Sequence, residues 1–193
     1  NGTHELDVAR WVMEVDFPEQ VKFSGGRFHF EDDWEFADTQ DVAYEFAGKK
    51  SIVWSGRSCN GMPIFGRSRG VSIHGTDGTI VMDREGYVLY DLKGKEIEAK
   101  PTQPESYGKK VNGIDGMTML HIKNFLDGIR SGTPLNAPIA DARKSVLLSH
   151  LGNIAQFHNG LLLIDPATGR IKDNPGAEKD WSREYEPGWE PTI

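Results

Sequence analysis

The first residues of the chain carry side chains that could take part in proton transfer. His4, Asp7 and Trp11 recur at spacings of three and four residues, so a helix would place a histidine, a carboxylate and an indole on one face. The positive end of the helix dipole would favour a neutral imidazole that accepts a proton, whereas the carboxylate would favour the protonated ring. The spacing leaves two interpretations open: a catalytic His4, or a histidine that only caps the helix or holds it by hydrogen bonds.

A second polar group has the character of a metal site. His29, Glu31, Asp32 and Asp33 lie close together in sequence and could bind calcium or zinc. The segment lacks the glycine and the spacing of an EF-hand, and it lacks the H-E-x-x-H register of a zinc protease. We therefore expect a solvated hairpin tip and no metal.

Helical periodicity appears at the start of the chain and again in its second half. Residues 3–15 read as a helix with Thr3 as the N-cap. Apolar residues at helical spacing predict a helix that Gly132 ends, and a longer helix from Pro138 to a stop at Asn159-Gly160. The first of these helices would position His4, Asp7 and Trp11.

Between these helical segments, residues 21–92 alternate between apolar and polar side chains, as strands do. Turns at Asp77-Gly78 and Glu85-Gly86 are too short for parallel crossovers, so the strands must be antiparallel. A short strand is expected at 161–164, followed by a polar tail along the surface. The predicted fold is α+β, with one mostly antiparallel, open-faced sheet and helices packed on one face.

An apolar stripe in this sheet has two interpretations. Tyr44, Phe46, Ile52 and Trp54 could form the core face, or they could pack against a second subunit. Helices on one side only would leave the other side free for a sheet-to-sheet contact. We expect a homodimer or tetramer formed through the open sheet face.

Composition excludes several classes of partner. The chain has 193 residues, and 29 acidic against 22 basic side chains give it a formal charge of -7, which argues against nucleic acid. Cys59 is the single cysteine, so neither an internal disulfide nor a cysteine-rich zinc site is possible. No apolar run is long enough to cross a membrane, and a cytoplasmic location is the default expectation. The chain starts at Asn1 and not at Met, so we expect upstream sequence, including any export signal, to be missing.

The opening segment also resembles a known family. Residues 2–11, GTHELDVARW, are similar to the G-x-H-x-x-D-x-A-x-W segment that opens the second domain of the glucose-fructose oxidoreductase and inositol dehydrogenase family (Gfo/Idh/MocA). The similarity continues at 25–28 (GGRF), 56–61 (GRSCNG), 73–79 (IHGTDGT), 122–127 (IKNFLD), 150–155 (HLGNIA) and 182–185 (SREY). The resemblance therefore covers nearly the whole chain.

This resemblance implies that residues 1–193 form one substrate-binding and oligomerisation domain, the C-terminal, dihydrodipicolinate reductase-like domain of the family. In such proteins an N-terminal Rossmann domain binds NAD or NADP and supplies a lysine, and His4 matches the histidine of the second domain. The family often has an aspartate four residues earlier, a position that would precede Asn1. The chain contains no G-x-G-x-x-G at a strand-to-helix turn, so we expect no cofactor binding and no hydride transfer by the isolated chain.

The resemblance also suggests substrate-binding residues. Arg57, Asn60 and Arg67 lie around the connection that faces the nicotinamide cleft in relatives, although both arginines could equally be solvated loop charges. Relatives often have an aromatic hydroxyl near the position of Phe65, and its absence here leaves the substrate class open. The implied substrate is a sugar or polyol.

Three functions remain in consideration. The first is an NAD(P)-dependent dehydrogenase, and the second is a glycosidase of the same fold that uses bound NAD for transient oxidation. The third is a non-catalytic carbohydrate-binding or assembly module in which His4 is structural. The fold does not choose among them.

Overall fold

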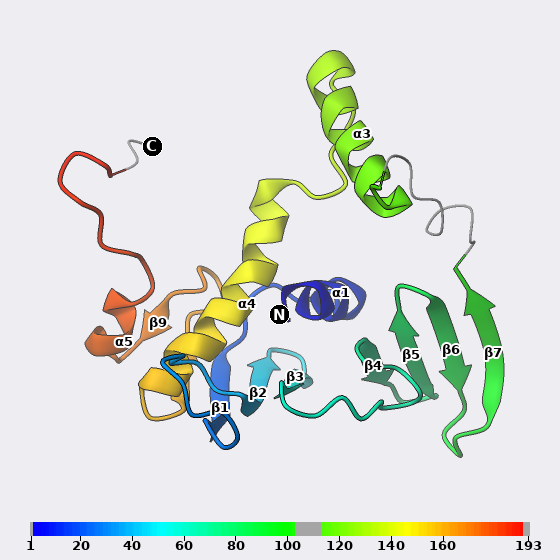
Figure 1. Cartoon of the computed structure of the whole chain (residues 1–193), viewed down its shortest axis with the longest axis horizontal. Coiled ribbons are helices and arrows are strands. Elements are labelled where there is room, and N and C mark those ends of the chain that lie inside the picture. The colour runs from blue at the N-terminus through cyan, green and yellow to red at the C-terminus, as the bar shows by residue number, and fades with distance from the viewer. Residues whose placement is uncertain (1, 103–112, 191–193) are drawn as a thin grey trace. The chain divides into compact units, whose positions relative to one another are not determined.

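The computed structural model describes residues 2–102 and 113–190, which belong to two compact units. The first unit combines Asn1–Gly61 with Arg143–Ile193, and the second is Met62–Ala142. Each unit is considered separately below, and their elements are labelled in Figure 1.

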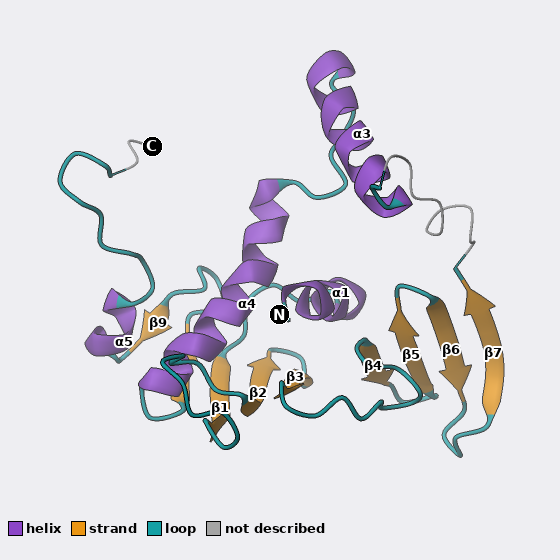
Figure 2. Cartoon of the chain, in the orientation of Figure 1, coloured by secondary structure: helices purple, strands orange, loops and turns teal. Residues whose placement is uncertain are grey.

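The first unit is a five-stranded antiparallel sheet with helices. Its strands are β1 (Gln20–Gly26), β2 (Thr39–Phe46), β3 (Lys50–Arg57), β8 (Leu161–Ile164) and β9 (Ile171–Lys172), in the order β3-β2-β1-β8-β9. Its helices are α1 (Thr3–Met13), α4 (Ile139–Phe157) and the short α5 (Pro175–Lys179), shown in purple in Figure 2. The strand predicted at 161–164 is confirmed, whereas β9 and α5 lie in the segment expected to be an irregular tail.

The first helix differs from its prediction at both ends. Thr3 is the first helical residue and not the N-cap; Gly2 holds the cap position with φ 98°, a backbone conformation that glycine adopts without strain. The helix ends at Met13, because Glu14 takes a left-handed conformation that bends the chain before residue 15. Neither change moves the side chains that share the face of His4.

The core of the first unit lies between α4 and one face of the sheet. Tyr44 is buried on β2, and its hydroxyl donates a hydrogen bond to the Leu148 carbonyl of α4 at 2.8 Å. Burial raises the pKa of this hydroxyl. Phe46 and Ile52 are also buried, and Trp54 is half-buried beneath Gly2. The apolar stripe is therefore the core face, and a second subunit is not what covers it.

The opposite face of this sheet is open and mixed in character. It carries the ion pairs Lys22–Glu45 at 2.6 Å and Arg57–Asp41 at 2.9 Å. Between them runs the cross-strand row Val53, Ala43, Lys22 and Leu161, in which Val53 and Leu161 are exposed. This is the helix-free sheet face that the sequence predicted.

The second unit holds a four-stranded antiparallel sheet and one helix. The strands β4 (Val71–His74), β5 (Thr79–Asp83), β6 (Gly86–Tyr90) and β7 (Glu96–Pro101) pair in chain order. The predicted helix ending at Gly132 is α3 (Gly116–Ser131), whose N-terminus is capped by Asp115 through the Thr118 amide at 3.1 Å. β7 was not predicted, because it is exposed along its length and mostly polar.

The α+β, antiparallel and open character of the fold is confirmed, but the strands form two hydrogen-bonded sheets and not one. The interruption lies between β3 and β4, where the segment contains Gly61, Pro63, Gly66 and Gly70. Glycine and proline weaken strand pairing, and only the isolated bridge Ile64–Arg67 forms in this part of the described chain. The sequence also predicts a polar connection at 101–114, most of which lies outside the described residues.

Candidate functional site

His4 lies in the first turn of α1, which packs against β3 at the edge of the first sheet. Gly2 packs on Trp54, near the last residues of β3, and Lys50, the first residue of β3, donates a hydrogen bond to the Met13 carbonyl at 2.7 Å. Helix α1 therefore runs antiparallel to β3, and its first turn lies towards Arg57. The His4 side chain is exposed there, as a proton-transfer group must be before substrate arrives.

A buried arginine fixes this helix. Arg10 is 4% exposed, and its Nε donates to the Ser145 hydroxyl of α4 at 2.7 Å. Ser145 in turn donates a hydrogen bond to the Asp7 carboxylate. Asp7 is therefore held by α4 and by Arg10 at 3.8 Å, and within the described chain it makes no hydrogen bond or ion pair with His4. The shared helix face does not become a His4–Asp7 dyad.

The loop of residues 27–37, here called the aromatic loop, lies at the same end of the sheet. It joins Gly26 to the strand that begins at Thr39, and Gly26, Thr39 and Arg57 are paired in register across β1, β2 and β3. The loop therefore ends close to Thr39, which pairs with Arg57, and begins one strand farther away, after Gly26. It contains the His29, Glu31, Asp32 and Asp33 group considered as a metal site.

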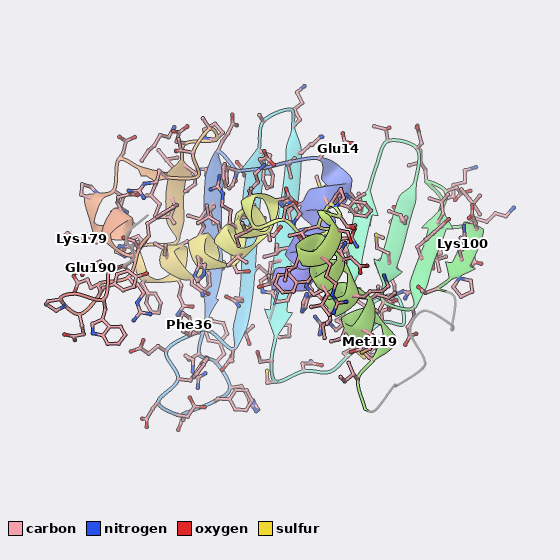
Figure 3. The ribbon with its side chains drawn as sticks, turned by 90° about the horizontal axis from the view of Figure 1, so that it is seen from above. Glu14, Phe36, Lys100, Met119, Lys179 and Glu190 are labelled. Carbon is pink, nitrogen blue, oxygen red and sulfur yellow. The ribbon has the colours of Figure 1, made fainter. Side chains whose placement is uncertain are left out.

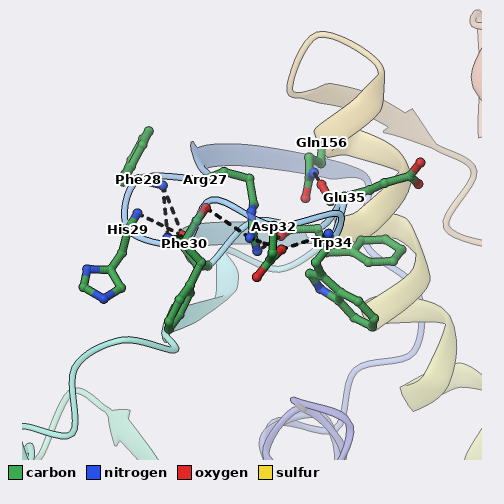
Figure 4. A network of polar contacts seen from close by, with 10 residues as sticks. Arg27, Phe28, His29, Phe30, Asp32, Trp34, Glu35 and Gln156 are labelled. Atoms are coloured by element: carbon green, nitrogen blue, oxygen red, sulfur yellow. Dashed lines mark hydrogen bonds and ion pairs between the residues drawn. The ribbon is translucent and has the colours of Figure 1, made fainter.

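Asp38 organises the first half of this loop from inside the fold (Figure 4). Its side chain is buried, and the carboxylate accepts backbone hydrogen bonds from Phe28 at 3.2 Å and from His29 and Phe30 at 3.0 Å. These bonds, that from Phe30 foremost, hold the pKa of Asp38 well below its usual range. The ionised carboxylate fixes the backbone from which Phe28, His29 and Phe30 project.

The second half of the loop is held by two other side chains. Arg27 donates to the Phe30 carbonyl at 3.1 Å and forms an ion pair with Asp32. Gln156 of α4 accepts a hydrogen bond from the Ala37 amide at 3.1 Å and donates one to the Glu35 carbonyl at 2.9 Å. The loop is therefore fixed to both the sheet and α4. Within residues 2–102 and 113–190, no group of His, Cys, Asp and Glu side chains has an arrangement that could hold a metal ion.

Arg57 and Asn60, the predicted substrate-binding residues of the first unit, lie at the end of β3 and in the turn that follows it. The Arg57 guanidinium donates to the Gln40 carbonyl at 2.8 Å and forms an ion pair with Asp41 at 2.9 Å. The Ser55 hydroxyl, together with Arg57, lowers the pKa of Asp41. Asn60 is exposed in the turn after β3, and its backbone N–H donates to the Arg57 carbonyl at 3.1 Å. Both residues lie where β3 ends, but the Arg57 side chain lies with Asp41 on the open face, opposite the face on which Trp54 and α1 pack.

Arg67 belongs to the second unit. Its side chain is 18% exposed and forms an ion pair with Asp83, so it is not a solvated loop charge. Its backbone pairs with Ile64 in the isolated bridge. The intervening Phe65 takes φ 52° and lies near Tyr90, with the ring centroids 6.5 Å apart.

The structure thus brings His4, Arg57, Asn60 and the aromatic loop to one end of the first unit. Sequence reasoning missed Asp38 and Gln156, which shape that loop. An aspartate directly before a strand is a known signal for side-chain-to-backbone bonding and could have indicated Asp38. No local signal could have indicated Gln156, which lies far along the chain from the loop it holds.

No model of a protein family matches the sequence, and no curated protein matches it either. Solved structures do match the fold. An oxidoreductase from Agrobacterium radiobacter, in complex with NAD+, L-tartaric acid and magnesium, is 16% identical, and its TM-score is 0.58. The match covers 84% of this chain and 47% of the oxidoreductase. The WlbA dehydrogenase from Bordetella pertussis, in complex with NADH and UDP-GlcNAcA, is 12% identical, and its TM-score is 0.50. The match covers 85% of this chain and 43% of the dehydrogenase.

At these identities the likeness shows the fold, which is the one predicted from the resemblance to a Gfo/Idh/MocA-like C-terminal domain. The chain spans about half the length of the first structures it matches. Among the described residues, none of the helices is both long and apolar enough to cross a membrane.

Proposed function

We propose that this chain is the substrate-binding and oligomerisation domain of an NAD- or NADP-dependent oxidoreductase that acts on a sugar or polyol. The observation that carries the proposal is the coverage: the fold accounts for 84% of this chain but only 47% of an oxidoreductase that binds NAD+. The other half of such a protein is long enough for a preceding nucleotide-binding domain. A cytoplasmic setting is consistent with the single free cysteine.

In this proposal His4 moves the proton of the reacting hydroxyl. The cofactor, bound by the preceding domain, supplies the hydride acceptor. The exposed imidazole of His4 takes the hydroxyl proton of the carbinol, and α1 holds it in place through Arg10 and Ser145. Arg57 and Asn60 are proposed to bind the substrate where β3 ends. Arg67 belongs to the second unit and stays a predicted substrate-binding residue.

The open face of the first sheet supports self-association. Val53 and Leu161 are exposed in one cross-strand row, and neighbouring charges are already paired as Lys22–Glu45 and Arg57–Asp41. Paired charges are easier to bury than single ones, so a second copy of the chain can cover this face. The proposed assembly is a dimer, or a tetramer built from dimers.

The test uses the whole protein that carries this domain, with NAD or NADP and a panel of free sugars, polyols and glycosides. Accumulation of NADH or NADPH with a free sugar or polyol is the expected result. Cleavage of a glycoside with no net accumulation of reduced cofactor would identify the glycosidase instead. Binding of a sugar without cofactor reduction or glycoside cleavage would identify the domain as a non-catalytic module.

A further inference from the structure

We propose that the aromatic loop is a wall of the substrate site that selects uncharged sugars or cyclitols over anionic ones. The proposal rests on the proposed function and adds a substrate class to it. It depends on three observations: exposed rings on a fixed backbone, the charge of the loop, and its position towards the same end of the first sheet as His4.

The loop presents aromatic rings to solvent without being loose itself. Phe28 is 73% exposed and Trp34 64%, yet the backbone beneath them is held by Asp38, Arg27 and Gln156. In Figure 4 the rings of Phe30 and Trp34 project from the same side of the loop. A fixed backbone reduces the entropy lost when a ligand binds, so such rings are suited to recognition.

Trp34 is supported from behind by other rings. Its ring centroid lies 5.8 Å from that of Phe36, which lies 5.8 Å from that of Phe157 at the end of α4. These two ring contacts connect the exposed indole of Trp34 to α4, the helix that packs on the sheet. One supported and largely exposed aromatic ring offers a flat surface for the C–H face of a pyranose or cyclitol.

The charge of the loop decides between classes of sugar. The carboxylates of Glu31, Asp33 and Glu35 make no hydrogen bond or ion pair with any residue that the structure describes. Carboxylates accept hydrogen bonds from sugar hydroxyls, but they repel a uronate or a phosphate. A neutral polyhydroxylated ring therefore fits this surface and an anionic one does not.

The two arginines at this end of the sheet do not make the electrostatic potential at the loop positive. Arg27 is paired with Asp32 and bound to the Phe30 carbonyl, and Arg57 is paired with Asp41 and bound to two carbonyls. An anionic substrate would have to break one of these pairs to reach a guanidinium. The field that a substrate meets at the loop is therefore negative.

The loop and the candidate catalytic residue lie towards the same end of the strands of the first unit. Helix α1 runs antiparallel to β3, so His4 lies towards Arg57 while Glu14 lies towards the start of β3. Figure 3 shows Phe36 of the loop and Glu14 at opposite ends of the strands of the first unit. The proposal places one substrate against both His4 and the loop.

The first test compares neutral and anionic substrates in the whole protein. Initial rates of cofactor reduction are measured with D-glucose and myo-inositol, and with D-glucuronate and D-glucose 6-phosphate. The expected kcat/KM is at least about tenfold higher for the better neutral compound, because like charges in a partly buried site cost a few kcal/mol. A higher kcat/KM for either anionic compound would overturn the inference and leave the proposed function standing. Reduction with none of the four, nor with the wider panel, would instead count against the proposed function.

A matched pair of charge variants assigns the selectivity to the loop. The variant Glu31→Gln/Glu35→Gln removes two loop carboxylates. The control Glu14→Gln/Glu19→Gln makes the same change at the opposite end of the sheet, since Glu14 follows α1 and Glu19 directly precedes β1. The loop variant should narrow the ratio of neutral to anionic kcat/KM at least about threefold, while the control leaves the ratio unchanged. An equal response in both variants, or none in the loop variant, contradicts the inference.

A second pair tests the stacking surface. Trp34→Ala should raise the KM for the neutral substrate about fivefold with little change in kcat, since a stacked ring contributes about 1 kcal/mol. Trp189→Ala removes an indole that is also largely exposed, in the C-terminal segment, and should leave KM unchanged. Circular dichroism of both variants confirms that they fold. An unchanged KM for a folded Trp34→Ala protein contradicts the stacking role.

Discussion

At the scale of single residues, Asp38 links loop geometry to pH. Its folded-state pKa is depressed, so its stabilising contribution is fully present above the unfolded value of about 3.9 and decreases as the pH falls below it. Asp38→Asn should lower the free energy of unfolding at neutral pH, and the deficit relative to the native protein should shrink towards pH about 3. Urea unfolding of both proteins at several pH values measures this difference.

Asp33→Asn is the matched control for this measurement. Asp33 is exposed in the same loop, and its carboxylate has no partner in the described chain. The same substitution there should leave the free energy of unfolding nearly unchanged at every pH. If the Asp38→Asn deficit stayed constant with pH, the carboxylate would not be the group that holds the loop.

His4 is the residue on which catalysis depends in the proposed function. His4→Ala should lower kcat in the whole protein at least about a hundredfold, the usual contribution of a positioned proton-transfer group. Substrate binding should change less, because His4 is exposed and is not part of the core. His121→Ala removes another exposed histidine, on α3, and should leave kcat unchanged. A fully active His4→Ala protein would assign His4 a structural role.

At the scale of elements, α4 approaches the sheet closely at Gly152. A Cβ there would lie 2.8 Å from the Tyr44 hydroxyl and 3.3 Å from a Val42 methyl. Alanine normally stabilises a helix by up to about 1 kcal/mol relative to glycine, but overpacking costs about 1–3 kcal/mol. Gly152→Ala should therefore destabilise the protein on balance, as measured by chemical denaturation.

The contact can be isolated with a double variant. Tyr44→Phe removes the hydroxyl nearest to the added Cβ, and it loses the bond to the Leu148 carbonyl, a change of about 1 kcal/mol. The double variant Tyr44→Phe/Gly152→Ala should be more stable than the sum of the two single changes. Simple additivity would show that α4 moves away from the sheet instead of clashing with it.

At the scale of the whole molecule, the open sheet face is expected to hold a second copy. Val53→Lys places an unpaired charge at the β3 end of the row of Val53, Ala43, Lys22 and Leu161, two strands from the existing charge of Lys22. The change should shift the protein towards monomer by at least about tenfold in the dissociation constant, measured by sedimentation velocity. Val146→Lys, an equivalent change on α4, should leave the assembly intact. A native protein that is monomeric at micromolar concentration would contradict the proposed interface.

The sequence alone determined the kind and order of most elements in this protein. Alternation in residues 21–92 and turns such as Asp77-Gly78 specified antiparallel strands, and Gly132 and Gly160 marked where helices stop. Such patterns succeed because they encode backbone conformation within a few residues of each position. Edge strands with weak apolar patterns, such as β7, were not predicted in this way.

Only the tertiary structure decided what depends on residues far apart in sequence. It assigned the stripe of Tyr44 and Phe46 to the core, directed Asp7 to Ser145 instead of to His4, and divided the strands between two sheets. It also fixed the aromatic loop through Gln156. A local pattern specifies which side chains share a face, but the partner of that face is chosen by packing between segments that the pattern does not connect.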